Sequence, residues 1–565
     1  MQISWIPERR ASAVQSFSLC LLCVLFVATV LRVLNTHYTT NDDTGIISFI
    51  VAGYPVPYMG IALSTLLHAA YAAVPGVAWF GCCLYALLTL SLYQWLALAW
   101  RVFPRLWLAV AATAVILGLY LDLLVSLDFT AVSAMLCMSA LSRAGVEVLG
   151  PGRRPWAFLV PGLVFAAGWL VRPDPALGAL AYALPVGAAV LVACLWRRPL
   201  QPEAVRLALA ALVFLLPLAL NLAVDDVWRA SVRTPLEAQY EARNDEIDAF
   251  YHLNAARREA TGRDAALLAS LHWTVRDSRR FLHWKFLDER VYTPQAVHAL
   301  VAGAAAPAVS APLLERHLRG RLFPHNTLFL LLLASLPLFV LLLCRGHPEG
   351  AIGLLLPFYS VALTVLMYVL HAYVYRVEMP FELGLGLMGV LLATALLGRS
   401  GVPPSRVSLA AACVSLLIAG TAAGYSVRSS LLLQRHDLRV AATVRRELQM
   451  LDTRFAGDVV LMQPVGNGLN VLSPLQPVVL RFHPIDLGWS TFSPLFYDQI
   501  RVLGVQHGYE LMDAMVDDPR AYLRGWQPWA RQLSSYATAH QQGGIEVVQV
   551  APRLQQLRSG GRAAP

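Results

Sequence analysis

About eleven apolar segments recur along this chain, and arginines follow every second one. The first covers residues 14–34 and the last covers residues 407–425. A transmembrane helix needs roughly twenty apolar residues, so most of these segments are long enough to cross a bilayer. The chain has 565 residues, of which 57% are hydrophobic and only 14% are charged. We therefore predict an α-helical polytopic membrane protein rather than a soluble fold.

The arginines also predict how the chain is oriented. Arg9 and Arg10 precede the first segment, and further arginines follow alternate segments, at positions 101, 154, 198, 345 and 399. Cytoplasmic loops are enriched in Lys and Arg, so we expect the amino terminus inside and the carboxyl terminus outside. Acidic residues at the segment ends then fall on the outer face. No small-residue cleavage site follows residues 14–34, which we interpret as an uncleaved first span.

Polar stretches divide the chain into four predicted parts. Residues 1–224 form an N-terminal transmembrane bundle, whose first exterior loop (35–78) contains interface helices within 44–75. Residues 225–325 form an extracytoplasmic, mainly helical segment, and residues 326–426 return to the membrane. Residues 427–565 form a small extracytoplasmic α/β domain. Its expected elements are a helix over 431–451, strands over 458–463, 478–482 and 545–550, and helices beginning at Ser493 and Asp518.

Charge and cysteine content exclude some classes of function. The net charge of +9 is scattered over segment boundaries instead of forming a basic stripe, so no nucleic-acid partner is expected. All eight cysteines lie in apolar segments, where a thiol behaves as a small hydrophobic side chain. The polar parts are therefore expected to fold without disulfides.

Two adjacent carboxylates, Asp42 and Asp43, follow the first segment directly. A charge beside hydrocarbon is costly unless something uses it. Such carboxylates serve as a general base, as metal ligands or as acceptors for a sugar hydroxyl, or they cap a helix that begins at Thr44. Arg172 and Arg376 are expected on the same outer face, although arginine is usually enriched on the cytoplasmic side. Each has an acidic neighbour, Asp174 beside Arg172 and Glu378 beside Arg376.

Several stretches, taken in order, resemble the C-type (GT-C) membrane glycosyltransferases, and in particular bacterial glucosyltransferase-like membrane proteins. The similarity extends to about residue 400, and the carboxyl-terminal part matches nothing that we can place. The stretches are Thr40-Asn41-Asp42-Asp43, Trp79-Phe80-Gly81, Trp169-Leu170-Val171-Arg172, Tyr251-His252-Leu253-Asn254 and Arg276-Asp277.

The resemblance implies an enzyme of the bacterial cytoplasmic membrane with its active site outside. It implies inverting transfer of a sugar from a polyprenyl-phosphate donor to a lipid-linked or polysaccharide acceptor among the membrane lipids. The family's first-loop aspartate acts as base, a role that falls here on Asp42 or Asp43. Some members use a divalent metal and others do not. No Asp/Glu/His cluster at ligand spacing assigns metal ligands in this chain.

The residues agree with this chemistry. A carboxylate can take the proton of an acceptor hydroxyl, and a lipid phosphate leaving as an anion needs positive charge nearby. We therefore assign substrate binding to Arg172, Asp174, Arg376 and Glu378. We expect them to meet the paired aspartates in one outer cavity roofed by residues 44–75, with Asp42 pointing inward and Asp43 capping the next helix.

Three alternatives stay open at the level of sequence. An exterior polysaccharide polymerase or ligase would share the donor and the face but not the first-loop carboxylate. A transporter would show two related halves, which the sequence lacks. A structural subunit of an envelope assembly would use the carboxyl-terminal part for binding and would tolerate loss of Asp42 and Asp43.

Overall fold

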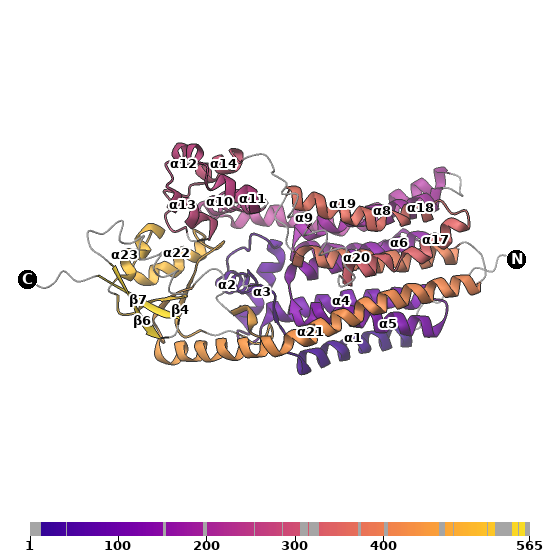
Figure 1. Ribbon diagram of the computed structural model, residues 1–565, viewed down its shortest axis with the longest axis horizontal. Helices are drawn as coiled ribbons and strands as arrows, with labels where there is room; N and C mark the ends of the chain where they lie inside the picture. The colour runs from indigo at the N-terminus through magenta and orange to yellow at the C-terminus, as the bar shows by residue number, and fades with distance from the viewer. Residues whose placement is uncertain are drawn as a thin grey trace, which may run out of the picture.

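A computed structural model describes residues 13–559, except for residues 41, 151–153, 196–199, 254, 285, 305–314, 316–326, 371–374, 400–404, 463–468, 478–479, 517, 526–544 and 552. The molecule is elongated, with a helical bundle at one end and a smaller unit that contains a sheet at the other (Figure 1). A segment of short helices, α10 to α14, lies beside that smaller unit.

Eight helices in the described part of the chain are long and apolar enough to cross a membrane. They are α1 (Ala13–Val33), α4 (Trp79–Val102), α5 (Leu106–Val125), α6 (Phe129–Leu149), α8 (Pro173–Leu195), α9 (Leu200–Val232), α20 (Tyr375–Arg399) and α21 (Arg406–Arg454). The other three predicted spans fall on shorter apolar helices: η1 (Pro155–Phe158) with α7 (Leu159–Val171), α16 (Thr327–Leu333) with α17 (Leu336–Cys344), and α19 (Leu356–Leu370). The chain is thus a multi-pass helical membrane protein.

Helix α6 lies at the centre of the bundle and packs against α4, α7, α8 and α20. Small side chains along α6 allow its neighbours to approach closely, as is usual between membrane helices. At Gly168 of α7, an added Cβ would come within 2.5 Å of the Cys137 sulfur of α6. This close approach sets the position of the end of α7, which carries Arg172.

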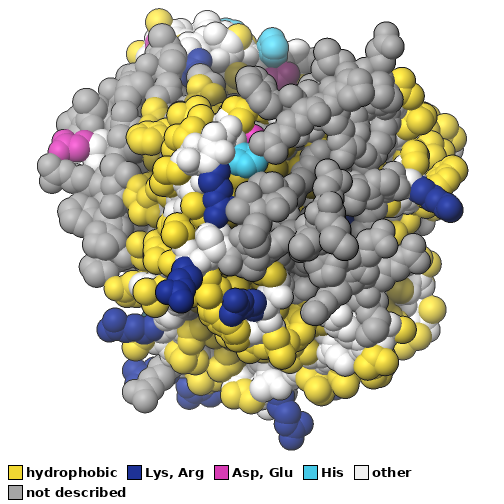
Figure 2. Space-filling model, turned by 90° about the vertical axis from the view of Figure 1, so that its right-hand side faces the viewer, with side chains coloured by type: hydrophobic (Ala, Val, Ile, Leu, Met, Phe, Trp, Pro, Cys, Tyr) yellow, Lys and Arg dark blue, Asp and Glu magenta, His cyan; other side chains and the backbone are white. Residues whose placement is uncertain are grey.

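The bundle has two chemically different ends. One carries Arg101, Arg105 and Arg345, and we call it the arginine end; Figure 2 looks onto it and shows Arg side chains over an apolar surface with few acidic ones. The expectation that acidic residues at span ends avoid this face is wrong for Glu147, whose carboxylate lies 2.5 Å from Arg101. Although the apolar run of this helix ends at Leu141, α6 continues to Leu149 and brings Glu147 to this end.

We call the opposite end, which carries Asp42, Arg172 and Asp225, the site end. The expected interface helices are present as α2 (Asp42–Ala52) and α3 (Ile61–Ala73). The Asp225 carboxylate accepts a hydrogen bond of 2.6 Å from the backbone amide of Ile61 and so holds the start of α3. Asp128 caps α6 by accepting from the amides of Thr130 and Ala131.

The segment after α9 contains α10 (Pro235–Tyr251), α11 (Ala255–Thr261), α12 (Ala265–Ser270), α13 (Val275–Leu282) and α14 (Pro294–Ala302). Its predicted first helix starts as expected, because Thr234 and Glu237 form a capping box. Aromatic residues from this segment, such as Phe250 and Phe286, share one hydrophobic core with Phe492 and other residues of the carboxyl-terminal part. The two segments therefore stabilise each other.

The carboxyl-terminal unit contains a five-stranded sheet in the order β4-β3-β5-β7-β6. Strands β3 (Val459–Met462), β4 (His483–Asp486) and β5 (Ala521–Arg524) run parallel, whereas β6 (Ile545–Ala551) and β7 (Leu554–Ser559) are antiparallel neighbours. Helices α22 (Pro494–Ile500), which Ser493 caps as predicted, and α23 (Leu511–Met515) complete the described unit.

Several predicted elements of this unit differ from the structure. The helix expected at Asp518 is wrong, because the chain turns there and enters β5. The strand expected over 478–482 lies instead at His483–Asp486, and residues 478–479 are outside the described part. The helix expected over 431–451 is the distal half of α21, which runs unbroken for 49 residues from the membrane to the sheet. Strands β5 and β7 were not predicted.

Candidate functional site

The stretch that precedes the paired aspartates is held by a short parallel pairing. Strand β1 (His37–Tyr38) pairs with β2 (Ser126–Leu127), the link between α5 and α6. The amide of Thr39 extends the pairing by donating to the carbonyl of Leu127 at 2.9 Å. Because β1 is fixed against two membrane helices, the first turn of α2 has a defined position at the site end.

Both aspartates lie in the first turn of α2, where the helix dipole favours negative charge. The prediction that Asp43 caps a helix beginning at Thr44 is wrong, since α2 already begins at Asp42. The Asp43 side chain is fully buried and accepts a hydrogen bond of 3.2 Å from the Thr40 hydroxyl. Asp42 is half-buried. The two carboxylates therefore have different surroundings, and Asp43 is part of the packed interior.

The Tyr58 hydroxyl marks the point where the polar groups of the site end converge. It lies 3.2 Å from the side-chain oxygen of Asn244 and accepts from the amide nitrogen of the same residue at 3.1 Å. Burial raises the pKa of Tyr58, and the negative charges of Asp248 and Asp42 raise it further. The hydrogen bond to Asn244 and the positive charge of Arg172 act in the opposite direction. Two carboxylates and one guanidinium thus act on a single hydroxyl.

Arg172 is held by the interior of the protein. Its backbone carbonyl accepts from the Ser133 hydroxyl at 2.8 Å, and a guanidinium N–H donates to the Thr130 hydroxyl at 2.7 Å. The guanidinium also lies over the rings of Phe129 and Tyr58, at 4.8 Å and 5.6 Å. Its Nε is buried without a hydrogen-bond partner, and no carboxylate in the described ranges forms an ion pair with it. The arrangement leaves positive charge available to an anion.

Asp248 was not predicted, and it is the second carboxylate beside Arg172. It follows Asn244 by one turn of α10, so both side chains lie on the same face of that helix. Burial raises the pKa of Asp248, the positive charges of His252 and Arg172 lower it, and the negative charges of Asp174 and Asp245 raise it again. Sequence periodicity identified the apolar face of this helix but could not show that its polar neighbours point at Arg172.

The remaining predicted site residues are divided between two places. Asp174 is exposed in the first turn of α8 and influences Asp248, and no ion pair joins it to Arg172 in the described structure. Glu378 is buried inside the bundle, where it accepts hydrogen bonds from the hydroxyls of Thr364 and Tyr182. Arg376 lies in the first turn of α20, and its side chain is outside the described part.

Aromatic residues cover the site from the carboxyl-terminal unit. The Trp489 ring stacks on Phe49 of α2 with 5.0 Å between ring centroids and meets Tyr58 edge-on at 5.5 Å. The Tyr240 hydroxyl donates to the Trp489 carbonyl at 3.0 Å. Gly45 allows this contact, because a Cβ there would lie 2.9 Å from the Trp489 ring. The expected cover from residues 44–75 is therefore completed by a residue far along the chain.

Metal binding has little support among the residues that can be assessed. The described ranges contain no group of three or more His, Cys, Asp or Glu side chains that could hold an ion. We therefore derive the chemistry of the site from its own side chains.

Comparison with known proteins finds similarity to a solved structure. No family model matches the chain, and no curated protein matches it. Among solved structures, it is similar to the crystal structure of ArnT from Cupriavidus metallidurans bound to undecaprenyl phosphate, with a TM-score of 0.40 and 12% sequence identity. The similarity covers 98% of this chain and 100% of ArnT, which is a GT-C glycosyltransferase.

Proposed function

We propose that the protein is a membrane glycosyltransferase that moves a sugar from a polyprenyl-phosphate donor to a lipid-linked or envelope-glycan acceptor at the site end. The observation that carries this proposal is the guanidinium of Arg172, which rests on aromatic rings and a hydroxyl with its Nε unpartnered, beside two carboxylates. In this proposal, the site end faces the outside of the bacterial cytoplasmic membrane, and the four-part division of the chain separates membrane helices from the parts that cover the site.

The reaction is a single displacement with inversion at the anomeric carbon. The acceptor hydroxyl forms the new C–O bond, the bond from the anomeric carbon to the phosphate oxygen breaks, and polyprenyl phosphate leaves with the electron pair. Asp42 receives the proton of the attacking hydroxyl. Arg172 binds the phosphate oxygens and stabilises the negative charge that develops on them.

Asp42 is the favoured base because it is half-buried beside Tyr58, whereas Asp43 is enclosed in the protein interior. Asp248 is close enough to Arg172 to feel its charge and, with Asn244 on the same face of α10, is suited to position the sugar hydroxyls through hydrogen bonds. Glu378 is enclosed by Thr364 and Tyr182, so we assign it a role in the bundle and no contact with substrate.

A turnover assay with variants of Arg172 tests the proposal. Purified protein in lipid nanodiscs is given polyprenyl-phosphate hexoses and an envelope lipid extract, and the release of polyprenyl phosphate is measured. Arg172→Ala should abolish release, and Arg172→Lys should recover only part of it, because lysine keeps the charge but loses the planar fork. Arg105→Ala, an exposed arginine at the other end, is the matched control. Full activity in Arg172→Ala would reject the proposal.

A polysaccharide polymerase or ligase is the second candidate. It is favoured by the size of the shared core that the α10–α14 segment and the carboxyl-terminal unit form beside the site end. It would use the same donor phosphate at Arg172 but would transfer a whole glycan chain. The size of the product separates the two reactions, because a glycosyltransferase lengthens its acceptor by one sugar at each turnover.

A further inference from the structure

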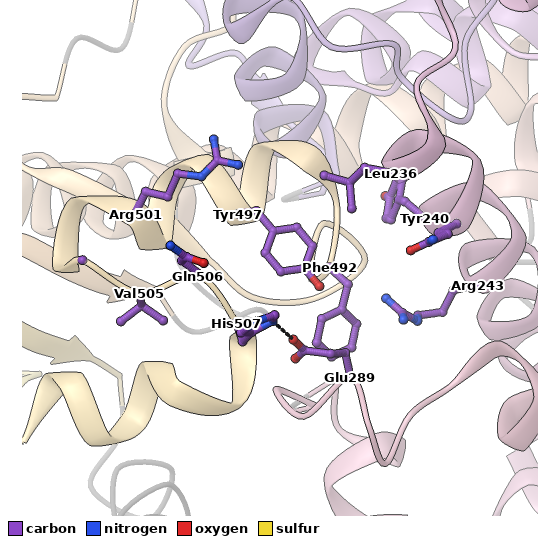
Figure 3. Close-up of a pocket in the computed structure, with 12 residues that line it drawn as sticks. Leu236, Tyr240, Arg243, Glu289, Phe492, Tyr497, Arg501, Val505, Gln506 and His507 are labelled. Carbon is purple, nitrogen blue, oxygen red and sulfur yellow. Dashed lines mark hydrogen bonds and ion pairs between the residues drawn. The ribbon is translucent and has the colours of Figure 1, made fainter.

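A cleft of about 740 Å³ opens between α10 and the carboxyl-terminal unit, and Tyr240 is one of its lining residues. One wall comes from the α10 residues Gln239, Tyr240 and Arg243, and the other from Phe492, Tyr497 and Gln506 (Figure 3). The volume is in the range of sites that bind small organic ligands. The cleft exists only because two segments distant in sequence pack on one shared core.

The lining combines flat aromatic surfaces with hydrogen-bonding groups. Tyr497 contributes a partly exposed ring, whereas Tyr240 and Phe492 are buried in the walls. Gln239 and Gln506 contribute amides that both donate and accept. Sugars are complementary to this lining, because they have apolar C–H faces and a rim of hydroxyl groups. The Glu289 carboxylate contributes further acceptor capacity, although His507 already contacts it at 3.2 Å.

Arg243 gives the cleft its charge preference. Its guanidinium lies 4.5 Å from the Phe492 ring and is hydrogen-bonded to the Tyr497 hydroxyl, and its Nε is buried without a partner. Burial lowers the pKa of Arg243, so the cation lacks part of the solvation that water would give. No described carboxylate forms an ion pair with it, whereas the neighbouring Arg501 pairs with Asp498 at 2.5 Å.

We propose that this cleft binds an anionic sugar chain, with Arg243 contacting a sugar carboxylate or phosphate, the Tyr497 ring packing on a sugar face and the amides of Gln239 and Gln506 bonding its hydroxyl groups. If the proposed function holds, the chain belongs to the acceptor. Arg243 and Asn244 are adjacent on α10, so the two sites occupy neighbouring faces of one helix. Tyr240 links the two sites, because it lines the cleft and its hydroxyl donates to the carbonyl of Trp489, whose ring meets Tyr58 edge-on.

Calorimetric titration of the purified full chain tests this inference without any turnover. The probes are trigalacturonic acid, a phosphorylated maltotriose, the neutral trisaccharide maltotriose and inorganic phosphate, all at millimolar concentration. We expect at least one charged trisaccharide to bind more tightly than both maltotriose and inorganic phosphate. Arg243→Gln should weaken that binding roughly tenfold or more, the usual value of a hydrogen-bonded charge pair. Gln239→Trp should block binding by filling the cleft from an exposed helical position.

Arg263→Gln is the matched control, because Arg263 is exposed in the same segment and away from the cleft. Equal binding of maltotriose or inorganic phosphate, unchanged binding in Arg243→Gln, or no binding of either charged trisaccharide would overturn the inference. Arg172→Ala should leave this binding unaltered. Turnover of the Arg172 variants therefore tests the proposed function, and sugar binding by the Arg243 variant tests the cleft. Either hypothesis can be rejected without the other.

Discussion

Two arginines at opposite ends of the helical bundle, Arg101 and Arg172, have different partners. At the arginine end, Arg101 forms an ion pair of 2.5 Å with Glu147, and Arg345 donates to the hydroxyls of Ser405 and Ser408. At the site end, Arg172 contacts two rings and the Thr130 hydroxyl, and its Nε has no partner. A paired charge contributes to the structure of the bundle, whereas a charge held ready without a carboxylate is suited to a ligand. Under the proposed function, Arg101 contributes to stability and Arg172 to binding.

Replacing Arg172 or Arg101 by alanine, one at a time, should give the largest and most different effects. Arg172→Ala should lower turnover about a thousandfold, as for other arginines that stabilise a phosphate in the transition state, with little change in thermal unfolding. Arg101→Ala should instead remove the guanidinium that pairs with the buried Glu147 carboxylate and cost on the order of 2 kcal/mol of stability, while the folded fraction keeps its turnover. Thermal unfolding and turnover, measured on both variants, check this. An active Arg172→Ala that unfolds early would reverse the assignment.

Asparagine variants of the two adjacent aspartates should differ in the same way, one in turnover and the other in stability. Asp42→Asn removes the proposed base while keeping size and hydrogen bonding, so turnover should fall roughly a hundredfold with unchanged stability. Asp43→Asn alters a fully buried carboxylate, so we expect a lower unfolding temperature to be its main effect. Rates per folded molecule distinguish the two variants. If Asp42→Asn transfers sugar normally, the base lies elsewhere.

The aromatic cover from the carboxyl-terminal unit should have a smaller effect. Gly45→Ala places a Cβ 2.9 Å from the Trp489 ring and must displace it, at a cost of about 1–2 kcal/mol. We expect turnover to fall severalfold because the ring no longer meets Tyr58. Gly76→Ala, where an added Cβ meets nothing within 4 Å, is the control and should behave as the wild type. Equal turnover in both variants would show that the cover is not needed.

Asp248 predicts a modest pH dependence of stability. Its pKa is raised in the folded protein, so the folded state binds a proton at a higher pH than the unfolded state does. Above the raised pKa, the charged Asp248 carboxylate therefore lowers the stability of the folded protein. This destabilisation disappears as the pH falls through that pKa. Asp248→Asn should be more stable than the wild type at pH 8, and the difference should shrink on acidification. The side chain is 36% exposed, so solvent screening limits the effect to about 1 kcal/mol or less. A difference that grows at low pH would contradict this sign.

Hydropathy predicted the membrane helices well because a bilayer requires long apolar helices whatever their partners are. Hydropathy did not predict the last turns of α6, because Ser142 and Glu147 are polar residues that are typical of a loop, although both are buried in the structure. The carboxyl-terminal sheet was harder, because strands β5 and β7 depend on pairing with distant segments that local patterns do not specify.

The candidate site was only partly accessible from the sequence. Asp42 and Arg172 could be identified because charges at membrane exits are unusual. Tyr58, Asp248 and Trp489 could not, because each is ordinary in its local context and gains its role from long-range contacts. The burial of Glu378 beside Thr364 could not be predicted either, because only helix packing reveals it.

The most direct test of the central claim is the binding of undecaprenyl phosphate to the site end, measured by native mass spectrometry on the wild type, Arg172→Ala and Arg105→Ala. The wild type and Arg105→Ala should retain one lipid phosphate with equal affinity. Arg172→Ala should lose it, because the remaining described contacts of the site offer hydroxyl groups, rings and carboxylates that do not replace a guanidinium. Retention of the lipid phosphate in Arg172→Ala, with affinity equal to the wild type, would contradict the account.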